Sequence, residues 1–179
     1  MILNVFNTEG GNRIVFRTLT EKDIKRAKDY TEYINSIIDE DDYILMNKKP
    51  SIKEEKEWVK KNLKAYERDE FTIVAECDGK IISVAEVRKH LWRMDHIASI
   101  GIAIREGYRS MGVGSEMMKL LIDKARLMKC KIIKLTVLST NKRAIGLYKK
   151  FGLKQVARIP KQIQRRGKLI DEIIMLKKL

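Results

Sequence analysis

The chain has 179 residues, of which 44% are hydrophobic and two are proline, and its formal net charge is +14. This length predicts one domain with a sizeable core over residues 1–179. The composition excludes a disordered chain, and no apolar run approaches the roughly 18 residues that a membrane span needs. The first residues lack the charged flank and apolar core of a signal peptide, so we expect a cytoplasmic protein.

The chain has only two cysteines, Cys77 and Cys130, and they lie far apart in the sequence. This usage favours free thiols in a reducing compartment over a disulfide framework. No metal-ligand spacing joins either cysteine to His90 or His96, so we expect no metal site.

The positive charge is concentrated in the C-terminal third of the chain. Residues 1–125 contain 22 Lys and Arg and 22 Asp and Glu, whereas residues 126–179 contain 16 and 2. Such a region is either a solvated basic surface or a binding surface for a polyanionic cofactor or a nucleic acid.

The predicted elements begin with a strand over 13–19. Capping-box patterns then open two helices, the first at Thr20 with Asp23 and the second at Ser51 with Glu54. A hairpin follows, with its strands over 71–77 and 81–90 and its turn at Asp78 and Gly79.

The second half of the chain alternates between strands and helices. The predicted elements are a strand over 96–104, a helix over 112–129, a strand over 131–139, a helix over 141–151 and two final strands over 153–164 and 168–176. The order is β-α-α-β-β-β-α-β-α-β-β. This order predicts a mixed sheet with helices on its faces, because the β-α-β-α section requires parallel neighbours.

A glycine-rich turn, with Gly107, Gly112 and Gly114, precedes the helix at 112. It is either a simple corner or a cradle for a phosphate, since a helix N-terminus has unpaired N–H groups and a partial positive charge. Two nucleotide motifs fit poorly. A Walker A loop would need Lys and Ser or Thr in place of Val113 and Gly114, and G-x-G-x-x-G would need glycine in place of Met117.

Three stretches together resemble the GNAT N-acetyltransferase superfamily. RSMGVG (109–114) resembles its Arg/Gln-x-x-Gly-x-Gly/Ala acetyl-CoA motif, and NKRAIGLYKKFGL (141–153) is similar to its second block, with Leu153 in place of Phe. RRGKLIDEIIM (165–175) is similar to the closing hairpin of the branch that holds ribosomal-protein and polyamine acetyltransferases. The resemblance covers about 80–179 well, and 1–79 only by element order. It implies a mixed, mostly antiparallel central sheet of about six or seven strands with flanking helices.

The resemblance also implies acetyl-CoA as co-substrate, without a metal, and a set of residues that bind it. The pantetheine arm would pair with the backbone of Ile102, Ala103 and Ile104. The pyrophosphate would bind to the amides of Ser110, Met111, Gly112, Val113, Gly114 and Ser115. Arg109 would add charge there or point to solvent, and Asn141 would cap its helix, contact CoA or do both. Lys149 and Lys150 are candidates for the 3′-phosphate.

Tyr148 is the candidate general acid for the CoA thiolate, since a phenol near the sulfur can protonate it; otherwise the ring only packs its helix against the sheet. The base is less clear, because this chain has Ala98, Ser99 and Thr136 where many relatives carry a glutamate. Glu86 on the preceding strand is the candidate base, unless it is only an exposed charge and a chain of waters removes the proton.

The acceptor side is indicated by an acidic run, Asp39, Glu40, Asp41 and Asp42, which follows the first helix. In relatives this connection walls the acceptor pocket. An acidic wall would favour a cationic amine, such as a polyamine, a lysine side chain or a basic protein tail, whereas the alternative is a solvated loop.

The resulting hypothesis is acetyl transfer from acetyl-CoA to a primary amine, on a small cationic molecule, a lysine or a protein N-terminus. Direct attack in a ternary complex is favoured, because neither cysteine sits in a motif that would activate it. Two alternatives stay open. One is a basic nucleic-acid-binding module, although only 7% of residues are aromatic. The other is a CoA-binding sensor without catalysis. We expect no membrane partner, and a homodimer is compatible with the sequence.

Overall fold

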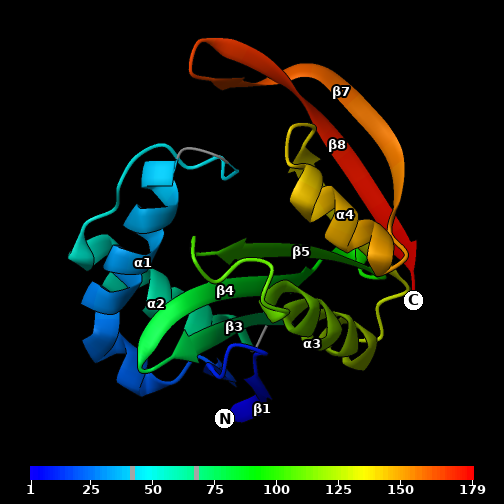
Figure 1. Ribbon diagram of the computed structural model, residues 1–179. Coiled ribbons are helices and arrows are strands. Elements are labelled where there is room, and N and C mark those ends of the chain that lie inside the picture. The colour runs from blue at the N-terminus through cyan, green and yellow to red at the C-terminus, as the bar shows by residue number, and fades with distance from the viewer. Residues whose placement is uncertain (41–42, 67–68) are drawn as a thin grey trace.

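An eight-stranded sheet forms the centre of the fold (Figure 1). The computed structural model describes residues 1–40, 43–66 and 69–179. The strands are β1 (Ile2–Asn7), β2 (Arg13–Thr18), β3 (Glu70–Cys77), β4 (Lys80–Lys89), β5 (Ile97–Ile104), β6 (Ile132–Leu138), β7 (Lys154–Arg165) and β8 (Lys168–Lys178), in the spatial order β1-β2-β3-β4-β5-β6-β8-β7. All neighbours pair antiparallel except β5 and β6, which are parallel. The predicted mixed, mostly antiparallel sheet is therefore confirmed, with one strand more than expected.

The additional strand is β1, which is not among the elements that the sequence predicts. It pairs with β2 at the edge of the sheet, and its side chains are exposed or half-buried. An edge strand of this kind shows little of the hydrophobic alternation that identifies a strand in a sequence. The ring of Phe6 on β1 nevertheless has a specific contact. A Cβ atom placed on Gly112 would lie only 2.8 Å from Phe6 Cζ, so β1 supports the glycine-rich turn.

Four α-helices accompany the sheet among the described residues: α1 (Ala27–Glu40), α2 (Ile52–Ala65), α3 (Val113–Leu127) and α4 (Lys142–Lys150). The described residues also include the short 3-10 helices η1 (Glu21–Arg26) and η3 (Trp92–Met94). Residues 21–26 were expected to begin the first α-helix. They form η1 instead, and within it Asp23 accepts hydrogen bonds from the Arg17 guanidinium at 2.7 and 2.8 Å and from Tyr30 Oη at 3.0 Å.

The helices cover both faces of the sheet (Figure 1). On one face α1 and α2 bury a cluster that includes Tyr30, Tyr33 and Val59. On the other face α3 and α4 pack on a larger cluster that includes Met117 and Leu121. The two clusters join the helices to the two faces of the sheet.

The parallel pair β5 and β6 separates after a short contact. Its register consists of Ile97 with Ile132, Ala98 with Ile133 and Ser99 with Lys134. Beyond that point β5 continues to Ile104 on β4, and β6 continues to Leu138 on β8. The two strands thus diverge, and the sheet opens between them.

Two smaller expectations are also confirmed. Cys77 and Cys130 are free thiols, and both are buried. The Asp78 and Gly79 turn has positive φ angles of 49° and 75°, as a two-residue hairpin turn requires.

No helix within the described parts of the chain is long and apolar enough to cross a membrane.

Candidate functional site

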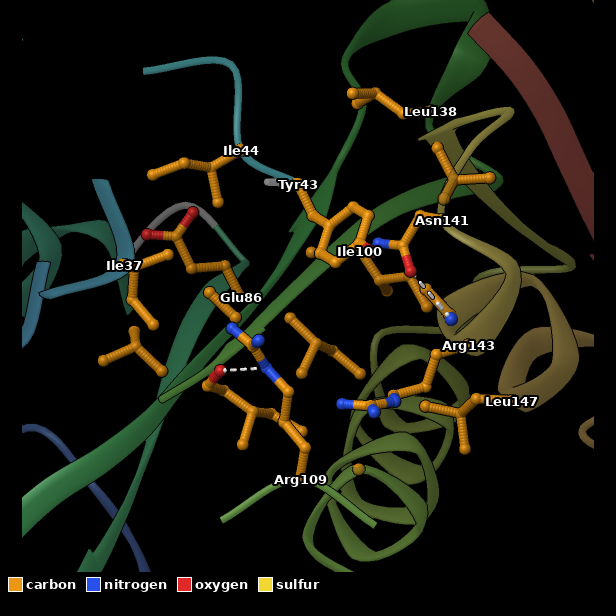
Figure 2. A pocket seen from close by; sticks show the side chains of 18 of the residues that line it. Ile37, Tyr43, Ile44, Glu86, Ile100, Arg109, Leu138, Asn141, Arg143 and Leu147 are labelled. Atoms are coloured by element: carbon orange, nitrogen blue, oxygen red, sulfur yellow. Dashed lines mark hydrogen bonds between the residues drawn. The ribbon is translucent and has the colours of Figure 1, made fainter. Parts of the chain in front are cut away.

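A cavity of about 1010 Å³ occupies the opening between β5 and β6 (Figure 2). One side is formed by α1, residues 43–46, α2 and β4. The other side is formed by the start of α3, by α4 and by Glu172 on β8. The cavity therefore connects the glycine-rich turn with the face of the sheet that α1 and α2 cover, and it is large enough for two ligands to meet.

The free edge of β5 forms the middle of the cavity. The amide of Arg105 donates to Ile82 O on β4, and the carbonyl of Ala103 accepts from Tyr33 Oη and Ser83 Oγ, both at 2.8 Å. Backbone groups alternate along a strand, so those of Ile102 and Ile104 point to the opposite, unpaired edge. Of the three residues predicted to bind pantetheine, Ile102 points its backbone groups to this edge, and so does the amide of Ile104, whereas Ile104 O accepts from Arg109 Nε at 2.8 Å. The carbonyl of Ala103 is engaged elsewhere, although the residue lines the cavity.

The glycine-rich turn places the N-terminus of α3 at the cavity. Gly112 is the N-cap residue with a left-handed φ of 88°, and Gly114 lies where a Cβ atom would be 3.0 Å from Leu147 and 3.3 Å from Ile104. The amide of Ser115 already donates to Gly112 O at 2.9 Å. The amides of Val113 and Gly114, at the first two positions of the helix, are thus the ones left for an anion.

The other residues predicted for the cradle lie at different depths. Ser110 and Ser115 line the cavity with Gly112 and Gly114. Met111 is exposed and Val113 is buried beneath the turn, so their side chains take no part. Backbone groups, rather than side chains, supply this part of the site.

Arg109 neither points to solvent nor is free for a phosphate. Its Nε donates to Ile104 O at 2.8 Å, and its guanidinium forms an ion pair with Glu40 at the end of α1. Glu40 also accepts a hydrogen bond from the amide of Glu106 at 3.1 Å. The side chain of Arg109 therefore fixes the turn to β5 and α1, which corrects the expectation that it adds free charge to the phosphate site.

Tyr148 enters the cavity from α4 and is only 7% exposed. Its hydroxyl has no hydrogen-bond partner in the part of the chain that the structure describes. Burial alone raises the pKa of Tyr148 to about 12. The phenol is therefore protonated at neutral pH and has a proton to donate.

Asn141 and Arg143 lie on the same side of the cavity (Figure 2). Asn141 Oδ1 accepts from the amide of Ala144 at 3.0 Å, which confirms the helix cap and leaves its Nδ2 group for a ligand. Arg143 and Lys150 also line the cavity, whereas Lys149 does not. Arg143 was not predicted. Its spacing of four residues from Leu147 on the same helix face was the signal for it.

Glu86 lies on the floor of the acceptor side, on β4 opposite Gly101 of β5. Gly101 has no side chain to cover it, so the carboxylate reaches the cavity. Burial raises the pKa of Glu86, although Arg88 donates to it at 2.5 Å and opposes the shift. A carboxylate with a raised pKa is a stronger base, which is consistent with the role predicted for Glu86.

The described part of the acidic run, Asp39 and Glu40 at the end of α1, does not form the free wall that was expected. Asp39 is exposed and paired with Lys49 at 2.6 Å, and Glu40, which lines the cavity, is neutralised by Arg109. Asp41 and Asp42 lie outside the described residues. Among the described members of the run, none offers an unpaired carboxylate to an acceptor.

A different carboxylate, Glu55 on α2, lines the acceptor side instead. It is 8% exposed, and burial raises its pKa to about 7, with a smaller contribution from Glu54. Glu55 was not predicted. It precedes the buried Val59 by four positions, and a charged residue on the apolar stripe of a helix was the signal for it.

Comparisons with known proteins agree on one family. The sequence profile of the acetyltransferase (GNAT) family matches residues 32–153. The N-alpha-acetyltransferase 30 of Dictyostelium discoideum is 32% identical over 91 residues, so the match spans 50% of this chain and about half, 49%, of that relative. A GNAT-family acetyltransferase from Streptococcus pneumoniae has a TM-score of 0.81 at 22% identity, over 93% of this chain and 99% of its own. The yncA protein of Salmonella typhimurium, solved with its cofactor acetyl-CoA, has a TM-score of 0.79 at 17% identity, over 93% and 94%.

Proposed function

Because this chain belongs to the acetyltransferase (GNAT) family, we propose that it transfers an acetyl group from acetyl-CoA to a primary amine. The observation that carries the proposal is the divergence of β5 and β6. Their pairing ends at Ser99 and Lys134, and the unpaired edge of β5 faces the same cavity as the N-terminus of α3. An extended pantetheine arm can add to such an edge as a further strand would, while the helix start binds the pyrophosphate.

The side chains around the opening support a direct transfer. The amine nitrogen attacks the thioester carbonyl, the C–S bond breaks and the sulfur leaves as a thiolate. Tyr148, protonated up to a pKa of about 12, donates the proton that the thiolate needs. The amine loses its proton to Glu86, directly or through water. Cys77 and Cys130 are absent from the cavity lining, and burial raises the pKa of each thiol, so neither is suited to form an acyl-enzyme.

The acceptor in this proposal is a cationic amine. Glu86 and Glu55 both line the acceptor side of the cavity, and carboxylates favour an ammonium group. Protein N-termini belong among the acceptors to be tested, because the relative from Dictyostelium discoideum is named an N-alpha-acetyltransferase. The cytoplasmic location, the single domain and a homodimer stay predictions.

The test is a panel of primary amines and basic peptides, with release of the CoA thiol as the readout. We expect thiol release that depends on both acetyl-CoA and an amine. Saturable acetyl-CoA binding without turnover on any amine would instead favour a CoA-binding sensor. Salt-dependent binding of DNA or RNA, with no binding of acetyl-CoA, would favour the nucleic-acid module.

A further inference from the structure

Glu55 is a buried carboxylate without a partner. It is 8% exposed, yet neither of its oxygens makes a hydrogen bond or an ion pair with any residue that the structure describes. It lines the acceptor side of the cavity from the first turn of α2. A buried carboxylate without a partner lowers the stability of the fold. Groups with this property are found typically at sites that bind a ligand.

The other carboxylates at the cavity differ from Glu55. Glu40 is paired with Arg109, and Glu86 is paired with Arg88 at 2.5 Å. Glu172 lies on β8, across the opening, and is less buried. Glu40, Glu55 and Glu86 are the described carboxylates that line the cavity on the side of α1 and α2. Of these three, Glu55 is the one whose charge is not balanced by an arginine.

Two aromatic rings line the same cavity as Glu55. Trp58 follows it by three positions, so both project from the same face of α2. The rings of Trp58 and Tyr30 have centroids 5.8 Å apart at an angle of 44°, and both line the cavity. Tyr30 is held in place by the hydrogen bond from its hydroxyl to Asp23. A carboxylate and aromatic rings that line one cavity are the chemistry that recognises an organic cation, by charge and by cation–π attraction.

We propose that Glu55, Trp58 and Tyr30 form a subsite for a second cationic group of the acceptor, separate from the amine that is acetylated. This inference rests on the proposed function for the identity of the first group. Glu86 on the sheet floor faces the reacting amine, whereas Glu55 on α2 takes an ammonium or guanidinium further along the same molecule. The pKa of about 7 supports the assignment, because a cation would convert a partly protonated carboxyl into the carboxylate.

Two kinds of acceptor carry such a second cation: a small polyamine, and a peptide with a Lys or Arg side chain near its reactive amine. The test therefore uses two matched pairs. One pair is an alkyl diamine and the monoamine of equal chain length. The other is a peptide with Lys and the same peptide with norleucine at that position. The variant is Glu55→Gln, and the control is Glu57→Gln, which removes an exposed carboxylate from the opposite face of α2.

In the wild type we expect kcat/KM to favour the cationic member of at least one pair by about tenfold or more, the range for a hydrogen bond to a charged group. In Glu55→Gln that ratio falls toward one, mainly through KM, and in Glu57→Gln it does not change. The pair that responds identifies the source of the cation. The inference is overturned if the wild type shows no preference in either pair, or if Glu55→Gln lowers both members of a pair equally.

A binding measurement separates this inference from the proposed function. Calorimetry on the complex of the protein with CoA measures the affinity for the diamine and for the Lys peptide, and it requires no turnover. Cation binding that is at least about tenfold weaker in Glu55→Gln supports the subsite even if no acetyl transfer occurs. Equal binding by the wild type and Glu55→Gln overturns it, whatever the activity.

Discussion

At the residue scale, the strongest argument that the Tyr148 hydroxyl serves the reaction is that it makes no hydrogen bond to any described residue. The ring is buried against the α3 and α4 side of the core, but the hydroxyl binds to no other described residue. Burial of a free phenol raises its pKa to about 12, so it stays protonated beside the thioester. Tyr148→Phe keeps the ring and removes only the proton donor. We expect kcat to fall by roughly 10²-fold with little change in acetyl-CoA affinity.

The control for this variant is Tyr66→Phe. The Tyr66 hydroxyl accepts from the amide of Leu19 and donates to Thr72 O, away from the cavity. Its loss affects stability rather than kcat. A Tyr148→Phe enzyme whose kcat stays within twofold of the wild type would leave the ring with a packing role only.

Glu55 makes a second prediction at this scale, in the pH dependence of stability. Its pKa rises from its usual value of 4.5 to about 7 on folding. Between these values the folded chain holds a proton that the unfolded chain has lost, so the stability contributed by this group falls as the pH rises through that range. Above pH 7 the ionised Glu55 lowers the free energy of unfolding by its full amount, about 3 kcal/mol at most. Its charged neighbour on α2, Glu54, adds to the shift.

Glu55→Gln removes this cost. We expect its Tm at pH 8 to exceed that of the wild type, by about 2–4 °C for each kcal/mol regained, and the difference to vanish near pH 4.5. Thermal denaturation of the two proteins across pH 4.5–8 measures this. Equal Tm values at pH 8 would show that the carboxyl is not desolvated as the structure has it.

At the scale of elements, the binding of an anion at the N-terminus of α3 can be tested without disturbing the packing of the helix. Substitutions at Gly112 and Gly114 do not allow this test. A side chain at Gly112 would meet Phe6 and a strained φ, and one at Gly114 would meet Leu147. Variants at these positions therefore test the fold as much as the binding of a phosphate. Ser115, in the first turn of α3 and at the cavity, has no such constraint.

Ser115→Asp has opposite effects on stability and on binding. A carboxylate in the first turn of a helix interacts favourably with its dipole, so the Tm should hold or rise slightly. The same charge repels a pyrophosphate, so we expect acetyl-CoA affinity to fall by tenfold or more, a loss of about 1.4 kcal/mol. Ser115→Asn is the matched neutral control and should bind acetyl-CoA nearly as the wild type does. Calorimetry on the three proteins decides it, and unchanged affinity in a folded Ser115→Asp would refute the phosphate cradle.

The elements also show what a sequence reveals about structure. Capping residues and apolar periodicity locate α2, α3 and α4 to within a few residues, since these signals are local. The edge strand β1 has no such signal. The 3-10 form of residues 21–26 and the ion pair of Asp23 with Arg17 are likewise not marked by any local pattern.

At the scale of the whole molecule, the cofactor side of the site could be predicted from local sequence patterns, whereas the acceptor side could not. The cofactor side is built largely from backbone groups that a short motif positions, so residues 109–115, Asn141 and Tyr148 could be proposed from the sequence. The acceptor side is assembled from α1, α2 and β4, which are distant in the chain. Glu55 reaches it only through tertiary packing, and the pairing of Glu40 with Arg109 removes a charge that the sequence alone leaves free.

The central claim is that one cavity brings acetyl-CoA and an amine together for direct transfer. The initial rate of thiol release, measured while the concentrations of acetyl-CoA and of the best amine are both varied, tests it most directly. We predict a rate that saturates in each substrate and reciprocal plots that intersect, as a ternary complex requires. Parallel reciprocal plots, which indicate an acyl-enzyme, or thiol release that is independent of the amine, would contradict it.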